Sequence, residues 1–296
     1  MKTIKTITRL ALGAAALGLG AGTAKATPYG FASNQFSDFT VLANGTPVDL
    51  SNGTQNTINT VTLGPDSSST SAPAVPSNAS DAPQATLGTG PFPAEGTYNP
   101  SQLSSGFGTR ADSDTSAFDP VNGISGNNVA EGRALSGTLS GTGQNTAAYT
   151  VGVTSGTQLE FQFSNDVLLI ASTDVPGEAA SASVQNDVRV LDGSGNLVFD
   201  FAPSGNGART IQGGSVSSDP FSLNQSVLSM DGSGATTASN GLNNDYFDAT
   251  TNPLGAGTYT IVMDSLSSES VPEPASLLLL GAGLMALGLL RRPTSI

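Results

Sequence analysis

Glycine and proline interrupt this chain so often that a mainly helical fold is excluded. Of the 296 residues, 36 are glycine and 17 are proline. Between residues 27 and 270, no window of twelve or more residues keeps a 3.6-residue hydrophobic period while avoiding both. In a helix interior glycine costs about 1 kcal/mol and proline about 3 kcal/mol relative to alanine. We therefore expect few helices, and strands joined by turns.

Strand patterns are clearest in the second half of the chain. Residues 159–163 alternate strictly between apolar and polar side chains, and residues 148–154 do the same. This period of two is typical of a strand with one buried face. Two further apolar runs, 184–190 and 197–201, flank the turn sequence Asp-Gly-Ser-Gly-Asn. Together they predict a β-hairpin.

The first hundred residues contain both turn signals and a proline-rich stretch. Apolar groups at 36–43 and 58–63 are separated by Asn-Gly pairs, which tolerate the positive φ angles of tight turns. Residues 64–100 hold seven prolines and only scattered hydrophobic residues. Such a segment cannot form a central strand, and we expect a long surface excursion or an ordered loop there.

With the apolar runs at 167–170, 221–230 and 259–264, the chain offers eight or nine short strands. Long connections rich in glycine, proline, serine and asparagine join them. This combination predicts an all-β fold. We expect a single antiparallel β-sandwich, jelly-roll-like, that spans residues 27–270.

Composition excludes several kinds of chemistry. The chain contains no cysteine, histidine or tryptophan, so zinc sites built on Cys or His, disulfide frameworks and histidine-dependent nucleophile systems lack their residues. Residues 27–270 carry four arginines and no lysine against 22 acidic residues, a formal charge of −18. Nucleic-acid binding needs a basic surface. We therefore expect no nucleic-acid partner.

The N-terminal residues have the pattern of a secretory signal peptide. Three basic residues lie within the first nine positions, and the apolar run 10–22 follows. Ala24 and Ala26 then occupy the two positions that signal peptidase reads. We expect cleavage after Ala26, which leaves Thr27 as the first residue. No paired arginine precedes the apolar run, so the general secretory route is favoured.

A second apolar segment lies near the C-terminus. Pro272, Glu273 and Pro274 precede the uncharged run 277–290, and a pair of arginines at 291 and 292 follows it. Fourteen helical residues span roughly 21 Å, against a hydrocarbon core of about 30 Å. A short transmembrane helix of this kind is a marginal anchor. Arg291 and Arg292 would keep its end cytoplasmic and place the body outside.

These three elements, in this order and spacing, resemble the PEP-CTERM sorting signal of Gram-negative bacteria, which is also described as the ice-binding-protein C-terminal domain. The resemblance covers only residues 271–296. It implies that a membrane-embedded exosortase recognises Pro272, Glu273 and Pro274 and cuts near them. The body then passes from transient inner-membrane attachment to the cell surface or the extracellular matrix. A simple tail anchor with an incidental Pro-Glu-Pro is the alternative.

Calcium binding is the one cofactor chemistry that the acidic residues leave open. Two groups could gather around Ca²⁺, although acidic residues in glycine-rich loops are more often only solvated. The first group is Asp112, Asp114 and Asp119, and the second is Asn243, Asn244, Asp245 and Asp248. Asp192 begins a sequence similar to a calcium loop, but Pro203 replaces the bidentate glutamate, so a hairpin turn is the better interpretation.

The sequence favours a body without catalytic residues. Two carboxylates suffice for glycoside hydrolysis, but sequence does not reveal their separation. Tyr98 and Tyr246 lie in expected loops and could stack on sugars, whereas Tyr149 and Tyr259 fit core positions. We therefore expect a non-enzymatic exported protein with a structural or interaction body, retained in or released to the extracellular polysaccharide matrix, and that polysaccharide is a candidate partner. A carbohydrate- or calcium-binding adhesion module is the main rival, and a secreted hydrolase the next.

Overall fold

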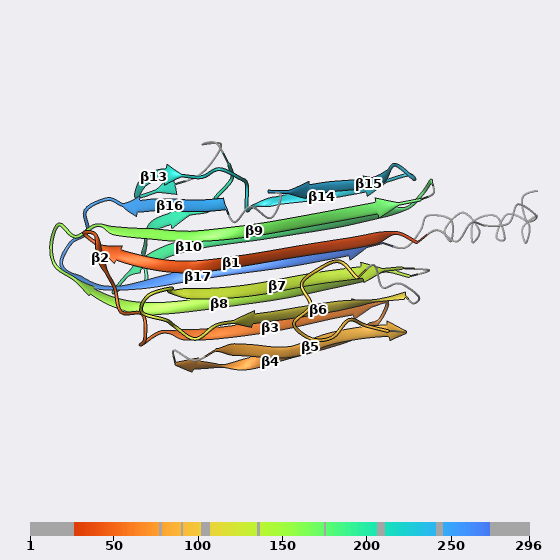
Figure 1. Ribbon diagram of the computed structural model, residues 1–296, viewed down its shortest axis with the longest axis horizontal. Coiled ribbons are helices and arrows are strands. Elements are labelled where there is room, and N and C mark those ends of the chain that lie inside the picture. Colours follow the sequence, from red (N-terminus) through yellow and green to blue (C-terminus); the bar gives the residue numbers. More distant parts are fainter. Residues whose placement is uncertain are drawn as a thin grey trace, which may run out of the picture.

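The computed structural model describes most of the chain between residues 27 and 272. The described ranges are 27–76, 79–89, 91–101, 107–134, 137–174, 176–205, 211–240 and 245–272. Within them the chain forms seventeen strands arranged as two layers of antiparallel sheet (Figure 1). This confirms the predicted all-β, sandwich-like fold.

One layer is a nine-stranded sheet. Its path runs β13-β16-β9-β1-β7-β6-β5, with β15 paired to β9 and β2 paired to β1. The strands are β1 (Tyr29–Ala43), β2 (Thr46–Pro47), β5 (Ser80–Thr89), β6 (Phe107–Thr115), β7 (Ile124–Arg133), β9 (Leu159–Thr173), β13 (Gly214–Ser218), β15 (Gly234–Ser239) and β16 (Asp245–Thr251).

The other layer is an eight-stranded sheet. Its path runs β12-β11-β10-β17-β8-β3-β4, and β14 pairs with β10. The strands are β3 (Thr54–Leu63), β4 (Asp66–Pro76), β8 (Leu139–Val153), β10 (Ala179–Asp192), β11 (Leu197–Phe201), β12 (Ile211–Gln212), β14 (Gln225–Met230) and β17 (Gly257–Val271).

No helix occurs in these described ranges, and so none of them holds a helix long and apolar enough to cross a membrane. The predicted signal segment 1–26 and the predicted membrane segment 277–290 both lie outside the described residues.

The predicted turns are present, for two different reasons. Asn44 and Gly45 both have positive φ angles, of 48° and 80°, and reverse the chain between β1 and β2. Gly53 is needed for space instead, because a Cβ atom there would lie 1.9 Å from Cδ1 of Tyr149. The predicted hairpin joins β10 to β11, and Asp192 accepts hydrogen bonds from the backbone N–H groups of Ser194 and Asn196 in its turn.

The expected loop at 64–100 was wrong for most of its length. Strand β4 forms one edge of the eight-stranded sheet and β5 one edge of the nine-stranded sheet. Edge strands tolerate proline because one side of the strand needs no hydrogen-bond partners. Register shifts in both strands, between Gln55 and Thr57 opposite β4 and between Ala82 and Ala85 in β5, absorb the irregular backbone.

The aromatic part of the apolar core lies toward one end of the sandwich. Phe39, Phe161, Phe163 and Phe247 extend from the nine-stranded sheet, and Phe199 meets them from the opposite sheet. The ring centroids of Phe161 and Phe199 lie 5.1 Å apart, as do those of Phe163 and Phe247. The first pair joins the two layers, and the second pair stacks between neighbouring strands β9 and β16 of one sheet. Tyr149 and Tyr259 are buried, as predicted.

Farther along the sandwich, the interior between the sheets is polar. The side-chain amide of Asn34 donates to Oδ1 of Asn186 and to Oγ of Ser265, both at 2.9 Å. The amide of Asn128 donates to the same Ser265 oxygen at 2.8 Å. All four side chains are buried. Strands with such inward residues show no hydrophobic alternation, which is why β6 and β7 were not predicted.

The first strand of the described residues starts at the end of the sandwich where the last strand finishes. In Figure 1, β1 starts where β17 finishes. A Cβ atom built on Gly30 would lie 3.2 Å from the Cβ of Glu269, so the two strands touch there. Val271 is fully buried and Pro272, the next residue, is exposed. The predicted sorting segment therefore begins directly at the edge of the folded body.

Candidate functional site

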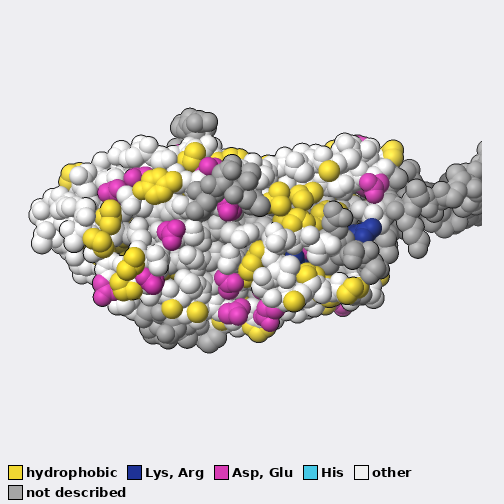
Figure 2. Space-filling model, in the orientation of Figure 1, with side chains coloured by type: hydrophobic (Ala, Val, Ile, Leu, Met, Phe, Trp, Pro, Cys, Tyr) yellow, Lys and Arg dark blue, Asp and Glu magenta, His cyan; other side chains and the backbone are white. Residues whose placement is uncertain are grey.

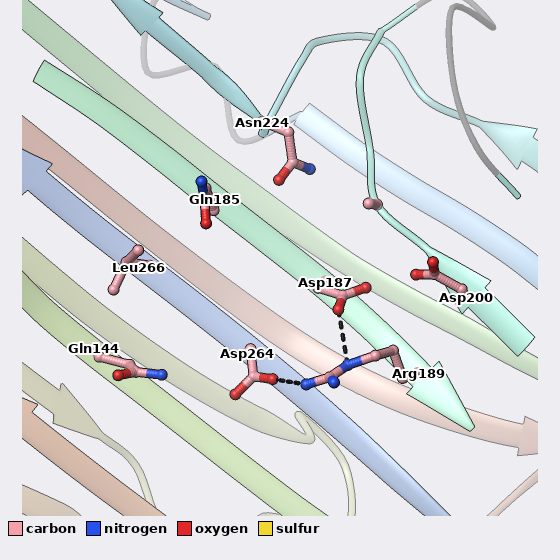
Figure 3. A pocket seen from close by; sticks show the side chains of 9 residues that line it. Gln144, Gln185, Asp187, Arg189, Asp200, Asn224, Asp264 and Leu266 are labelled. Carbon is pink, nitrogen blue, oxygen red and sulfur yellow. Dashed lines mark hydrogen bonds and ion pairs between the residues drawn. The ribbon is translucent and has the colours of Figure 1, made fainter. Parts of the chain in front are cut away.

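A polar cleft lies on the outer face of the eight-stranded sheet. Successive residues of a strand point to opposite faces, so Gln185, Asp187 and Arg189 of β10 point outward while Val188 and Val190 are buried. Neighbouring strands add their own outward residues, and the cleft has a volume of about 420 Å³ (Figure 3). Its lining consists of Gln144, Gln185, Asp187, Arg189, Asp200, Ala202, Asn224, Asp264 and Leu266.

Arg189 joins the two carboxylates that lie opposite each other in the cleft. Asp187 on β10 and Asp264 on β17 are directly paired in register. The Arg189 Nε atom lies 2.8 Å from Oδ2 of Asp187, and a terminal nitrogen of the same guanidinium contacts Oδ2 of Asp264 (Figure 3). Thr146 donates to the other Asp264 oxygen at 2.7 Å. The guanidinium thus offsets the repulsion between two facing acids.

Asp187 also contacts a second carboxyl group, that of Asp200 on β11. Burial is the largest cause that raises the pKa of Asp187, to about 7, and the hydrogen bond with Asp200 and its negative charge add to the effect. The positive charge of Arg189 lowers that pKa in part. Near neutral pH Asp187 therefore carries a proton for part of the time. The Oδ1 atoms of Asp187 and Asp200 are buried and have no hydrogen-bond donor.

Sequence reasoning did not identify this cleft. Asp187 and Arg189 alternate with valines along one strand, which was a usable signal for an outward charged row. Gln144 and Asp264 reach the same place only because β8 and β17 pair along their lengths. Such long-range pairing leaves no local pattern in the sequence.

Most residues of the predicted sorting and cleavage sites lie outside the described residues. These are Ala24, Ala26, Glu273, Pro274, Arg291 and Arg292. Two residues of these sites are described. Thr27, the expected first residue after cleavage, lies shortly before β1, and Pro272, the first residue of the motif, directly follows β17.

The residues of the two predicted acidic groups are placed differently in the structure. Asp112 and Asp114 lie on the same face of β6, because they are two residues apart. Asp119 is separate from them and accepts hydrogen bonds from the backbone N–H groups of Val121 and Asn122 in its own turn. Asp245 and Asp248 fall on opposite faces of β16, so the second predicted group does not converge. Asn243 and Asn244 lie outside the described residues.

The two tyrosines considered for sugar stacking also differ. Tyr98 is partly buried, and its hydroxyl donates to Oδ2 of Asp114 at 2.5 Å. Tyr246 is 45% exposed on the outer face of β16. Neither tyrosine lines the polar cleft.

Charge is unevenly spread over the surface. On the face shown in Figure 2, acidic side chains are scattered widely, whereas lysine and arginine occupy a small area near one end. With 22 acidic residues against four arginines in residues 27–270, the field around the body is negative. Such a field repels polyanions and attracts cations.

The chain is thus an all-β sandwich, and its last strand is followed directly by a C-terminal tail. That tail is a PEP-CTERM protein-sorting motif, and the profile of this motif matches residues 270–292. The motif marks an exported protein that is processed by exosortase. The match overlaps the sandwich only at Ser270 and Val271, the last two residues of β17.

Other comparisons add no further relationship. Among curated proteins none matches the chain significantly. A structure of infectious bursal disease virus, Gx strain, is 12% identical over 85% of this chain and 68% of its own, with a TM-score of 0.12. The K1 cleaved adhesin domain of Lys-gingipain from Porphyromonas gingivalis W83 is 11% identical over 41% of this chain and 82% of its own, with a TM-score of 0.08. At such TM-scores neither likeness supports an argument about fold or function.

Proposed function

We propose that the sandwich is a non-catalytic surface or matrix module that binds extracellular polysaccharide through the polar cleft. The observation behind this proposal is the lining of the cleft, in which amide and carboxyl groups from four strands and one loop converge on an open face. Sugar hydroxyls both donate and accept hydrogen bonds, and amide and carboxylate side chains complement both roles. The negative field of the body favours a neutral polysaccharide over an anionic one.

The unsatisfied oxygens of the cleft support the same assignment. Oδ1 of Asp187 and Oδ1 of Asp200 are buried and have no hydrogen-bond donor. A buried acceptor left unpaired costs about 1–3 kcal/mol, which a ligand hydroxyl could recover. Leu266 and Ala202 add a small apolar surface suited to the carbon face of a sugar ring.

A secreted hydrolase is the second candidate, because Asp187 has a raised pKa beside another carboxyl group. Retaining glycosidases separate their two carboxyls by about 5 Å and inverting enzymes by about 6.5–9.5 Å. Asp187 and Asp200 are in hydrogen-bonding contact instead, which leaves no space between them for the reacting bond. Arg189 also occupies one oxygen of Asp187. This geometry favours binding over hydrolysis.

Calorimetric titration of the full chain, purified in mild detergent, with the producer's own exopolysaccharide tests the proposal. We expect saturable binding that Asp187→Ala and Asp264→Ala each weaken at least tenfold. Glu160→Gln, on the outer face of the opposite sheet, is the matched control and should bind like the wild type. Unchanged binding by both cleft variants would refute the assignment. Release of reducing sugar, lost in Asp187→Ala, would establish the hydrolase instead.

A further inference from the structure

A second group of carboxylates converges on the outer face of the nine-stranded sheet. Asp81 on β5 is paired in register with Asp114 on β6, and Asp112 lies one position diagonal to it on the same face. Glu95 approaches from residues 91–101, which pass over this face. One carboxylate oxygen each from Asp81, Glu95 and Asp112 lies within 4.8 Å of the other two. Sequence analysis had singled out only Asp112 and Asp114.

Asp112 distinguishes this group from an ordinary cluster of solvated acids. Its side chain is fully buried. Oδ2 accepts a hydrogen bond of 2.8 Å from the backbone N–H of Gly96, but Oδ1 is buried and has no donor. A buried carboxylate oxygen without a partner is costly to keep charged. Burial is accordingly the largest cause that raises the pKa of Asp112.

The nearest cation does not neutralise the group, because other partners bind it. Arg110 donates from Nε to Glu131 at 2.8 Å and from its terminal nitrogens to the backbone carbonyls of Thr97 and Asn99. Asp114 is satisfied separately, since it accepts hydrogen bonds from Tyr98 and from Asn127. Asp81, Glu95 and Asp112 thus lie close together, and none of the ion pairs among the described residues includes any of them; the charge of Arg110 acts on Asp112 only without direct pairing.

We propose that Asp81, Glu95 and Asp112 bind one calcium ion. Carboxylate oxygens are the ligands that this hard cation prefers, at about 2.3–2.6 Å. Ligands of one Ca²⁺ ion lie at most about 4.6–5.2 Å apart, so three oxygens that all lie within 4.8 Å of one another can share one ion. Backbone carbonyls or water would complete the coordination.

The ion would connect three separate segments. Asp81 lies on an edge strand, Asp112 on the neighbouring strand, and Glu95 in the segment that covers both. Calcium would therefore fasten residues 91–101 to the sheet and protect the β5 edge from pairing with other chains. This site is on the opposite sheet from the polar cleft, so it is independent of the proposed polysaccharide binding.

Calcium titration of the full chain in mild detergent, after treatment with a chelator, tests this site. We expect one Ca²⁺ per chain by calorimetry, and a higher Tm with CaCl₂ than with NaCl or MgCl₂ at equal ionic strength. Asp112→Asn keeps the acceptor for Gly96 but removes the charge, and should abolish both effects. Asp66→Asn, at an exposed turn between β3 and β4, is the matched control and should retain them.

In the absence of calcium, we expect Asp112→Asn not to lower the Tm. Because Asp112→Asn relieves repulsion, its Tm without calcium should equal or exceed that of the wild type. This behaviour separates loss of a ligand from failure to fold. The proposal is overturned if Asp112→Asn binds Ca²⁺ as tightly as the wild type does and is less stable than the wild type when calcium is absent.

Terbium luminescence can locate the ion, because the chain has no tryptophan and Tyr98 adjoins the acidic group. Tb³⁺ bound at this site should emit on tyrosine excitation, and Ca²⁺ should displace it. Tyr98→Phe should lower the emission at least twofold while Ca²⁺ still binds. Full emission from Tyr98→Phe, or equal stabilisation of the wild type by Na⁺, Mg²⁺ and Ca²⁺, would overturn the proposal.

Discussion

Thr109 Oγ1 donates a hydrogen bond of 2.8 Å to Glu269 Oε1, and this contact joins the two sheets at the polar end of the sandwich. Glu269 is buried, and its Oε2 atom has no partner. Burial is the largest cause that raises the pKa of Glu269, to about 8 from an ordinary value of 4.5. The charge of Glu131 raises it further, and the Thr109 hydrogen bond opposes both.

Stability should therefore fall as the pH rises from about 4.5 to 8. In this window the folded state retains a proton on Glu269 that the unfolded chain releases, at a cost of about 1.4 kcal/mol per pH unit. Glu269→Gln should flatten the dependence and exceed the wild type in stability at pH 8. Urea denaturation at pH 5, 6.5 and 8 measures this. Asp187→Asn separates the contribution of Asp187, whose pKa is also raised, and a wild-type stability that is constant with pH would contradict the prediction.

Gly132→Ala should destabilise the protein by about 1–3 kcal/mol, because it overfills the space around Glu269. The new methyl group would lie 2.3 Å from Cδ1 of Leu139 and 2.5 Å from Oε2 of Glu269. Gly152→Ala is the matched control, since nothing lies within 4 Å of its added methyl group. Equal thermal stabilities of the two variants would show that the polar interior can expand.

Arg110→Met should cost about 3–5 kcal/mol, because it removes the cation of the buried Arg110–Glu131 ion pair. Arg189→Met provides the contrast. Its guanidinium is 37% exposed, so we expect a loss of about 1 kcal/mol or less. Adding Glu131→Gln to Arg110→Met should recover part of the loss. Denaturation curves for these variants measure the difference, and similar losses at both arginines would disprove it.

Glu273→Ala should leave the sandwich folded but stop tail processing, because it removes the one charged side chain of the Pro-Glu-Pro motif. Immunoblots of membrane and medium fractions should show a longer, membrane-associated form. Ser276→Ala changes the same tail without altering the motif and serves as the control. Normal release of Glu273→Ala at the normal size would argue against exosortase recognition of this residue.

Sequence patterns predicted those parts of the fold where apolar residues fill the interior. The β10–β11 hairpin and the strand around Phe161 alternate as expected because their inward side chains join the aromatic core. Strands β6 and β7 place serine, threonine, asparagine and glycine inward, so they have no apolar period to recognise. The hydrogen bonds that replace apolar packing depend on partners from distant strands, such as Asn34 with Asn186.

The functional residues were only partly predictable for a related reason. Asp112 and Asp114 were grouped by sequence as possible calcium ligands, but the strand that places them on one face was not predicted. Asp81 joins them through the β5–β6 register, and Glu95 through the path of a covering segment. In the cleft, Arg189 and Asp264 meet across 75 positions of sequence. Sequence alone reveals neither the register between two strands nor the path of a segment that covers them.

The position of β17 also determines when the body can be completed. It pairs with β8 on one side and β10 on the other, so it is the only link between the two halves of the eight-stranded sheet within the described residues. Until Gly257–Val271 has crossed the membrane, two long strand edges stay open to unwanted pairing. The sorting tail follows at once, at Pro272. Completion of the sheet and presentation of the tail therefore coincide during export, which leaves little time for a half-assembled body to be released.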